Sequence, residues 1–139
     1  MSAAAVAMES TTSTNELHTV LIMPPSGLRN ALALSLWDQG MVVTAFGTLP
    51  EAEAILSGVG VQCVVLDDQL GLDVLAPLMA WLHNRGKQRV TVVVMGDAAM
   101  TWRPHLSALG IHHVVPRPAQ PARWAVQLAS ALGMPANRW

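Results

Sequence analysis

The sequence predicts an α/β domain with a doubly wound, five-stranded parallel sheet in the strand order 2-1-3-4-5. First, short segments rich in Val and Ile alternate with segments whose apolar residues recur at helical spacing. Second, the strand segments are apolar at nearly every position, which is typical of parallel strands covered by helices on both faces. Third, the connections are short, and right-handed crossovers then leave few topologies, of which this order is the commonest at this size.

The composition limits the class of protein. The chain has 139 residues, 52% of them hydrophobic and only 12% charged, with a net charge of −1. This is enough for one domain with a core, and the balance of charge argues against direct nucleic-acid binding, which usually needs a basic surface. A surface so poor in charge suggests that a protein partner covers part of it.

The expected localisation depends on whether the sequence has a membrane-spanning or signal segment. It has no apolar run long enough to span a membrane and no basic, then apolar, N-terminal signal. The single cysteine, Cys63, excludes an internal disulfide and fits a reducing compartment, so we expect a cytoplasmic protein. Glycine-rich phosphate loops and Gly-x-Ser-x-Gly motifs are also absent, so we expect neither a cofactor nor enzymatic activity.

The elements can be placed in order along the chain. We expect a flexible tail over residues 1–17, a folded domain over 18–133, and a second tail or the start of a linker over 134–139. Strands are expected at 20–23, 41–46, 61–66, 90–95 and 111–115. Helices are expected after the cap Ser26, after the capping box Thr48–Glu51, before Gly86, over 101–109 and over 121–132.

Two adjacent carboxylates, Asp67 and Asp68, end the central strand of this pattern. The carboxyl ends of parallel strands form the edge of an open α/β sheet where ligands bind. This edge is therefore where the sequence places its candidate site.

Two motifs identify the pattern more closely. Val64-Val65-Leu66-Asp67 resembles the phospho-acceptor strand, and Val115-Pro116-Arg117-Pro118 resembles the Lys-Pro signature, of bacterial response-regulator receiver domains of the chemotaxis-Y type. The resemblance covers residues 19–133 as an order of elements. It implies a role in two-component signalling or a phosphorelay. It also implies a Mg²⁺-binding acidic pair after strand one, an acceptor Asp after strand three, a hydroxyl after strand four and a Lys after strand five.

This chain departs from that pattern at four of the five positions, counting the acidic pair as two. Met23-Pro24-Pro25 replaces the acidic pair, Gly96 replaces the hydroxyl, and Arg117 replaces the lysine, so only Asp67 remains in place. Mg²⁺ needs oxygen ligands, and without the metal the charge on a transferring phosphoryl group is not neutralised. The sequence therefore predicts a pseudo-receiver that keeps the fold and has lost phosphoryl transfer.

The residues of this degenerate pocket have other expected roles. Asp67 is either a vestigial acceptor or the partner of Arg117 in a bidentate ion pair, and we favour the pair. Asp68 and Asp97 are expected at the rim, and a metal site built from Asp67, Asp68 and Asp97 is disfavoured, so no metal is predicted. The resemblance implies a cis bond between Arg117 and Pro118. The full set is Pro24, Pro25, Asp68, Gly96, Asp97, Arg117 and Pro118.

Tryptophan is unusually frequent, with five residues against one Phe and no Tyr. These side chains either border the core or form an interface, where Trp is enriched. The resemblance implies contacts through the fourth helix, fifth strand and fifth helix, and hence a homodimer or a protein partner there. The candidate interface residues are Trp102, His105, Leu106, His113 and Trp124.

Three functions follow from these observations. The first is a non-phosphorylatable regulatory module that acts by protein–protein interaction in bacterial signalling or transcription control. The second is a divergent receiver that is still phosphorylated on Asp67. The third is a small-molecule sensor that uses the degenerate pocket, whose lost polar groups make it more apolar. If the chain is part of a longer regulator, we expect a DNA- or RNA-binding output domain to follow.

Overall fold

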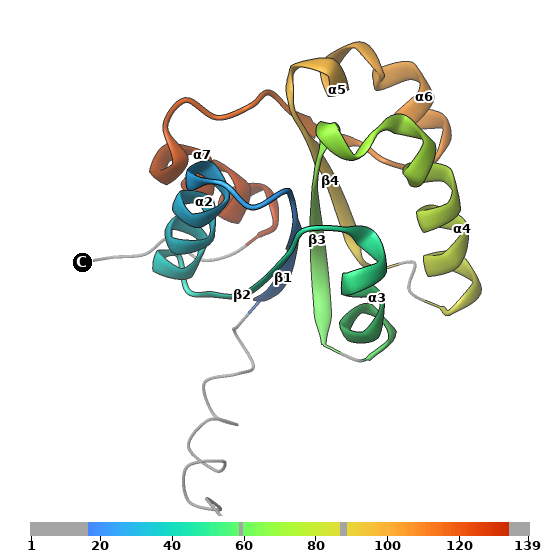
Figure 1. The fold of residues 1–139 in the computed structure, drawn as a ribbon, viewed down its shortest axis with the longest axis horizontal. Coiled ribbons are helices and arrows are strands. Elements are labelled where there is room, and N and C mark those ends of the chain that lie inside the picture. Colours follow the sequence, from blue (N-terminus) through green and yellow to red (C-terminus); the bar gives the residue numbers. More distant parts are fainter. Residues whose placement is uncertain (1–16, 59, 87–88, 134–139) are drawn as a thin grey trace, which may run out of the picture.

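A single parallel sheet forms the centre of the computed structural model, which describes residues 17–58, 60–86 and 89–133 (Figure 1). Its strand order is β2-β1-β3-β4-β5, as predicted. The strands are β1 (Leu17–Ile22), β2 (Met41–Phe46), β3 (Val61–Asp67), β4 (Thr91–Met95) and β5 (His113–Val115). All neighbouring pairs are parallel, so the carboxyl ends of the strands lie along the same edge of the sheet.

Helices cover both faces of the sheet. Figure 1 shows α2 and α7 on one side and α3 and α4 on the other, with α5 and α6 beyond the carboxyl end of β4. Two short 3₁₀ turns, Asp68–Leu70 and Leu72–Val74, connect β3 to α4. The helices are α2 (Gly27–Asp38), α3 (Leu49–Ser57), α4 (Leu75–Asn84), α5 (Asp97–Thr101), α6 (Arg103–Ala108) and α7 (Pro121–Ala131).

The domain has two hydrophobic cores, one on each face of the sheet, and the central strand β3 contributes side chains to both. Val64 and Leu66 pack with α3 and α4, whereas Cys63 and Val65 pack with α2 and α7. Successive side chains of a strand point to opposite faces, so a strand between two helical layers must be apolar at every position. This explains why β3 reads as a continuous apolar run.

The helix starts agree with the predicted caps. The Ser26 hydroxyl accepts a hydrogen bond of 3.0 Å from the Arg29 N–H. The Glu51 carboxylate accepts bonds of 3.0 and 3.1 Å from the N–H groups of Gly47 and Thr48. These contacts satisfy backbone donors that have no partner inside the helix.

Three expectations about the elements were wrong. Leu17, expected in the tail, is the first residue of β1, while the remaining expected tail residues, 1–16 and 134–139, lie outside the described part of the chain. Strand β5 has three residues, beginning at His113 rather than Ile111. The helix expected over 101–109 is shorter, α6 over Arg103–Ala108, and a separate helix that was not expected, α5 over Asp97–Thr101, precedes it. The two are separate because Pro104 cannot donate a backbone hydrogen bond and the chain breaks at Trp102.

Candidate functional site

Arg117 joins two carboxylates at the carboxyl end of the sheet. Its Nη2 lies 2.7 Å from Asp67 Oδ1 and 3.0 Å from Asp68 Oδ1. The side chain of Asp67 is 1% exposed and that of Asp68 9%, so one guanidinium compensates two largely buried charges. The expected contact between Asp67 and Arg117 is present, but it is not bidentate, because a single nitrogen bridges both acids.

The sheet brings these residues together. Asp67 is the last residue of β3, and Arg117 follows β5 after one intervening residue, Pro116. Strand β4 separates the two strands, and the long Arg side chain crosses its end. Asp67 Oδ1 also accepts a hydrogen bond of 3.3 Å from the Gln69 N–H, which starts the turn after β3. Asp67 Oδ2 is buried and has no hydrogen-bond partner in the described part of the chain.

Asp68 does more than occupy the rim, which corrects the expectation for this residue. Its Oδ2 accepts hydrogen bonds of 2.9 Å from Ala98 N–H and 3.4 Å from Ala99 N–H in the first turn of α5. A negative side chain is stabilised there by the unpaired N–H groups of the helix start. Asp68 therefore ties the end of β3 to α5 as well as to Arg117.

Gly96 makes room for this carboxylate. Its φ angle is +137°, a conformation that L side chains rarely adopt, and a Cβ atom at this position would overlap the carboxylate of Asp68. The Gly96 N–H donates to the carbonyl of Val115 at 2.9 Å, which holds the ends of β4 and β5 together. The position where the resemblance implies a hydroxyl is thus filled by Asp68.

The charges of the site stabilise one another. The hydrogen bond to Asp67 raises the pKa of Arg117, burial opposes this, and the charges of Asp67, Asp68 and Asp97 add to the rise. Asp97 is exposed at the start of α5. Since Arg is fully ionised at any ordinary pH, the bridge is a permanent charge contact rather than a titrating one.

The loop after β1 offers no carboxylate to this edge. Met23 is buried, Pro24 is half-buried and Pro25 is exposed. The Met23 carbonyl accepts a hydrogen bond of 3.3 Å from Arg29 Nη1, so a cationic side chain contacts this loop. Among the described residues, no group of three or more His, Cys, Asp or Glu side chains is placed to hold a metal ion.

The bond between Arg117 and Pro118 is trans, like every described peptide bond, so the expected cis bond was wrong. With the ordinary trans geometry, the guanidinium already reaches both Asp67 and Asp68.

The pocket expected for a small molecule is arranged differently. A cavity of about 310 Å³ contacts Arg117 and Pro118 but runs along the connection to α7. Its described lining includes neither Pro24, Pro25 nor Gly96. Of the seven residues of the degenerate pocket, this cavity therefore contacts only Arg117 and Pro118.

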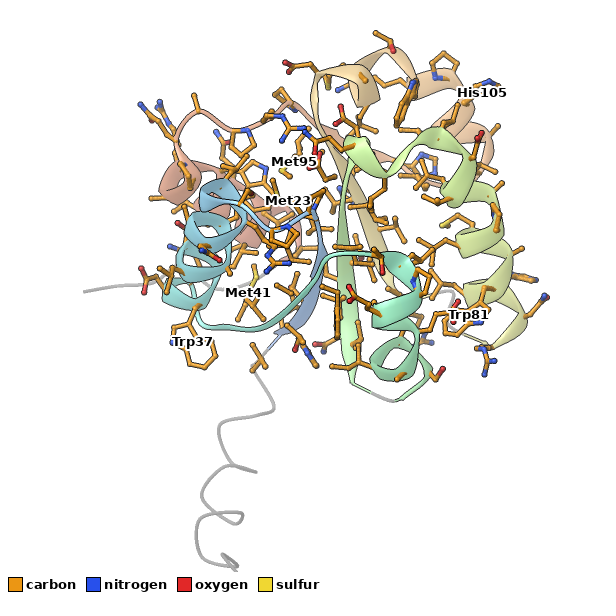
Figure 2. All side chains as sticks on the ribbon, viewed as in Figure 1. Met23, Trp37, Met41, Trp81, Met95 and His105 are labelled. Atoms are coloured by element: carbon orange, nitrogen blue, oxygen red, sulfur yellow. The ribbon has the colours of Figure 1, made fainter. Side chains whose placement is uncertain are left out.

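The candidate interface was partly wrong. Leu106 is 0% and Trp124 5% exposed, and each packs in one of the two cores. His105 is exposed on α6, as Figure 2 shows, while Trp102 and His113 are half-buried. The most exposed large apolar side chains belong to α2 and α7 instead, and include Trp37 at the outer end of α2 (Figure 2). They are Leu34, Trp37 and Val126.

Among the described residues, no helix is long and apolar enough to cross a membrane. The one cysteine, Cys63, is a buried free thiol. Burial raises its pKa to about 12, against a smaller lowering by the hydrogen bond with Thr19. It stays protonated and is not a nucleophile at ordinary pH.

Comparison with known proteins gives structural matches only. The chain matches no protein-family model and no curated protein sequence. An orphan response regulator of H. pylori is 14% identical, with a TM-score of 0.70 over 84% of this chain and 96% of that one. A receiver protein from Burkholderia phymatum is 17% identical, with a TM-score of 0.69 over 88% and 99% of the two chains.

A third match is an atypical orphan response regulator whose structure is described as revealing a phosphorylation-independent regulatory mechanism. It is 13% identical, with a TM-score of 0.70 over 88% of this chain and 100% of that one. These identities are low, and the likeness is one of fold. Together with the strand order and the short crossovers, they show that the chain has the fold of response-regulator receiver domains.

Proposed function

We propose that this domain is a pseudo-receiver, a regulatory module that acts by protein–protein contact and does not accept a phosphoryl group on Asp67. The observation that carries the proposal is the bridge from Arg117 Nη2 to Asp67 and Asp68. We expect no enzymatic activity and no cofactor.

Each component of phosphoryl transfer to Asp67 meets an obstacle. The loop after β1 has Met and Pro where Mg²⁺ would need oxygen ligands. The carboxylate of Asp67 is 1% exposed and already faces a cation, so an incoming phosphoryl group would have to displace Arg117. The N–H groups at the start of α5 are hydrogen-bonded to Asp68 and are not free to sense a new anion.

Control must then come from a binding partner rather than from a modification. A ligand or partner shifts a domain between states only if it binds one state more tightly. One structural neighbour is described as having a phosphorylation-independent mechanism, which is a statement about that protein and a precedent for this fold. We place the module in bacterial signalling or transcription control, in the cytoplasm.

The surface of α6, β5 and α7 is where we propose that a protein partner docks. Trp102, His105 and His113 remain accessible there at least in part. Self-association through the same surface is the second form of this proposal. We propose no direct nucleic-acid binding by the domain. Light scattering separates the two forms, since a homodimer would double the mass of the purified chain.

The experiment that tests the proposal is incubation with acetyl phosphate and Mg²⁺, followed by intact-mass measurement. A receiver with a complete acidic pair serves as the positive control in the same mixture. We expect an adduct on the control and none on this chain. A stable phosphoryl adduct that disappears in Asp67→Asn would overturn the proposal and support the divergent-receiver alternative.

A further inference from the structure

Strand β5 lies at the edge of the sheet and, within the described residues, pairs with β4 alone. The Val115 carbonyl accepts from the Gly96 N–H, on the β4 side. Backbone groups of successive strand residues point to alternate sides, so the N–H and carbonyl of Val114 face outward. Arg103 Nη2 lies 3.5 Å from the Val114 carbonyl, at the limit of a hydrogen bond, so this edge is only weakly covered.

A groove runs beside this edge. One cavity of about 190 Å³ and another of about 310 Å³ share Val115, Trp124 and Gln127 in their linings. We call this continuous depression between β5 and α7 the β5–α7 groove. Its apolar wall includes Trp124, whose buried indole Nε1–H has no hydrogen-bond partner among the described residues. The groove therefore combines an outward-facing strand edge with an apolar surface.

The segments that form the groove contain no acidic residue. Every Asp and Glu of the chain lies at or before Asp97, so the part of the chain that forms α6, β5 and α7 contains none. Arg123 lines the groove and Arg103 contacts the edge of β5, and neither forms an ion pair within the described residues. Arg117 is different, because its charge is compensated by Asp67 and Asp68.

We propose that the β5–α7 groove binds an extended acidic segment of a partner protein, which adds its backbone to the outer edge of β5. Addition of a strand to an open sheet edge uses main-chain hydrogen bonds for affinity and side-chain pockets for specificity. Acidic side chains on one face of the added strand would lie near Arg123 in the groove, and those on the other face would lie near Arg103 of α6. The inference rests on the proposed function, since it names the partner of that same surface.

Two other occupants fit less well. A second copy of this chain would bring its own Arg103 and Arg123 against the same cations, and like charges at close range repel. A nucleic acid would match the charge, but single strands are usually held by exposed aromatic platforms. Here Trp124 is 5% exposed, so it offers no face on which a base can stack.

The test measures fluorescence anisotropy of the full chain with labelled synthetic peptides. The probes are a peptide of alternating Glu and Val, its Lys and Val counterpart, and the acidic peptide N-methylated at alternate residues. We expect the acidic peptide to bind, the basic one not to bind, and N-methylation to weaken binding at least tenfold. Binding should weaken as salt is added, because the charges are exposed.

Variants locate the site. Arg103→Glu/Arg123→Glu should lose the acidic peptide at least tenfold, whereas Arg89→Glu, an exposed cation outside the groove, should not. Val114→Pro removes an outward N–H and leaves the β4 ladder intact, so it should also weaken binding. If circular dichroism shows this variant unfolded, the N-methylated peptide makes the same test.

Several results would overturn the inference: no binding of the acidic peptide, equal binding of both peptides, or loss of binding in Arg89→Glu. Tight binding of a single-stranded oligonucleotide that competes with the peptide would assign the groove to nucleic acid instead. None of these results bears on phosphorylation. Conversely, a phosphoryl adduct on Asp67 would overturn the pseudo-receiver proposal, and the peptide-binding measurement could still be interpreted.

Discussion

The central strand β3 and the edge strand β5 differ in their burial, in their strand pairing, and in how far the charges near their ends are compensated. Strand β3 has seven residues, of which the last five are buried. Asp67 at its end and Asp68 after it are compensated by Arg117 and the start of α5. Strand β5 has three half-buried residues, one open edge, and two neighbouring arginines, Arg103 and Arg123, that form no ion pair within the described residues. In a receiver fold, the end of β3 would be the place of a switch.

Arg117 connects the two strands and explains the difference. It follows the end of β5, and its guanidinium compensates Asp67 and Asp68 at the end of β3. In the pseudo-receiver that we propose, the chain itself closes the acceptor site. Arg103 and Arg123, which form no ion pair within the described residues, lie around β5. We therefore expect function at the edge of the sheet rather than at the acceptor position.

The largest expected effect is that of Arg117→Ala. It leaves Asp67, buried at 2% exposure, without a counter-charge. Removing one partner of a buried ion pair destabilises a protein by about 3 kcal/mol or more. Urea unfolding measures the free energy of unfolding.

Arg123→Ala is the matched control, since Arg123 is exposed and has no ion pair within the described residues. It should change the stability by less than about 0.5 kcal/mol. Equal losses in the two variants would mean that the bridge at β3 is no more important than a surface charge, and the comparison of the strands would fail.

A second prediction concerns the space beside Asp68. Gly96 and Gly60 both have positive φ, +137° and +102°, but a Cβ would collide with Asp68 at position 96 and meet nothing within 4 Å at position 60. Both changes to Ala carry backbone strain, and only Gly96→Ala also displaces the carboxylate. We expect Gly96→Ala to cost about 2 kcal/mol more than Gly60→Ala. A difference near zero, from thermal or urea unfolding, would show that Asp68 does not need this space.

The sequence predicted the sheet well because burial on both faces leaves a visible signature. The apolar runs of β3 and β4 indicated a covered parallel sheet, and the order of elements followed from it. The sequence also predicted the contact between Asp67 and Arg117, since both residues lie at the carboxyl ends of strands. It did not reveal that Asp68 caps α5, because that contact depends on how the loops after β3 and β4 meet.

Trp124 shows a different reason for error. It lies on the apolar stripe of α7 with Leu128, and this stripe packs against the sheet. The enrichment of Trp at interfaces suggested that Trp124 is exposed, but the helical spacing of the apolar residues in α7 predicts its burial correctly. The break at Trp102 similarly followed from Pro104, a local signal that outweighs the apolar pattern around it.

The burial of β3 can also be tested through the pH dependence of stability. The pKa of Cys63 is raised from 9.0 to about 12, so the folded state holds this proton more tightly than the unfolded state. Its contribution to stability is full below pH 9.0 and is lost as the pH rises toward about 12. The slope of this loss approaches about 1.4 kcal/mol per pH unit.

Cys63→Ala removes this contribution and serves as the comparison. The difference in unfolding free energy between the native chain and Cys63→Ala should stay constant from about pH 7 to about pH 8 and shrink above about pH 9. A difference that stays constant over the whole range would mean that the thiol of β3 is accessible to solvent, in contrast to its buried position.

The most direct test of the closed site is the amide NMR spectrum of the full chain with Mg²⁺ and beryllofluoride, a mimic of an acyl phosphate. The reporters are the amides of Gly96, Ala98 and Ala99, which lie at the hydrogen bonds made to Val115 and Asp68. If Arg117 and Asp68 close the site permanently, these resonances stay in place on addition of the mimic. Shifts at these three amides that are absent in Asp67→Asn would show a working switch at the end of β3 and contradict the account.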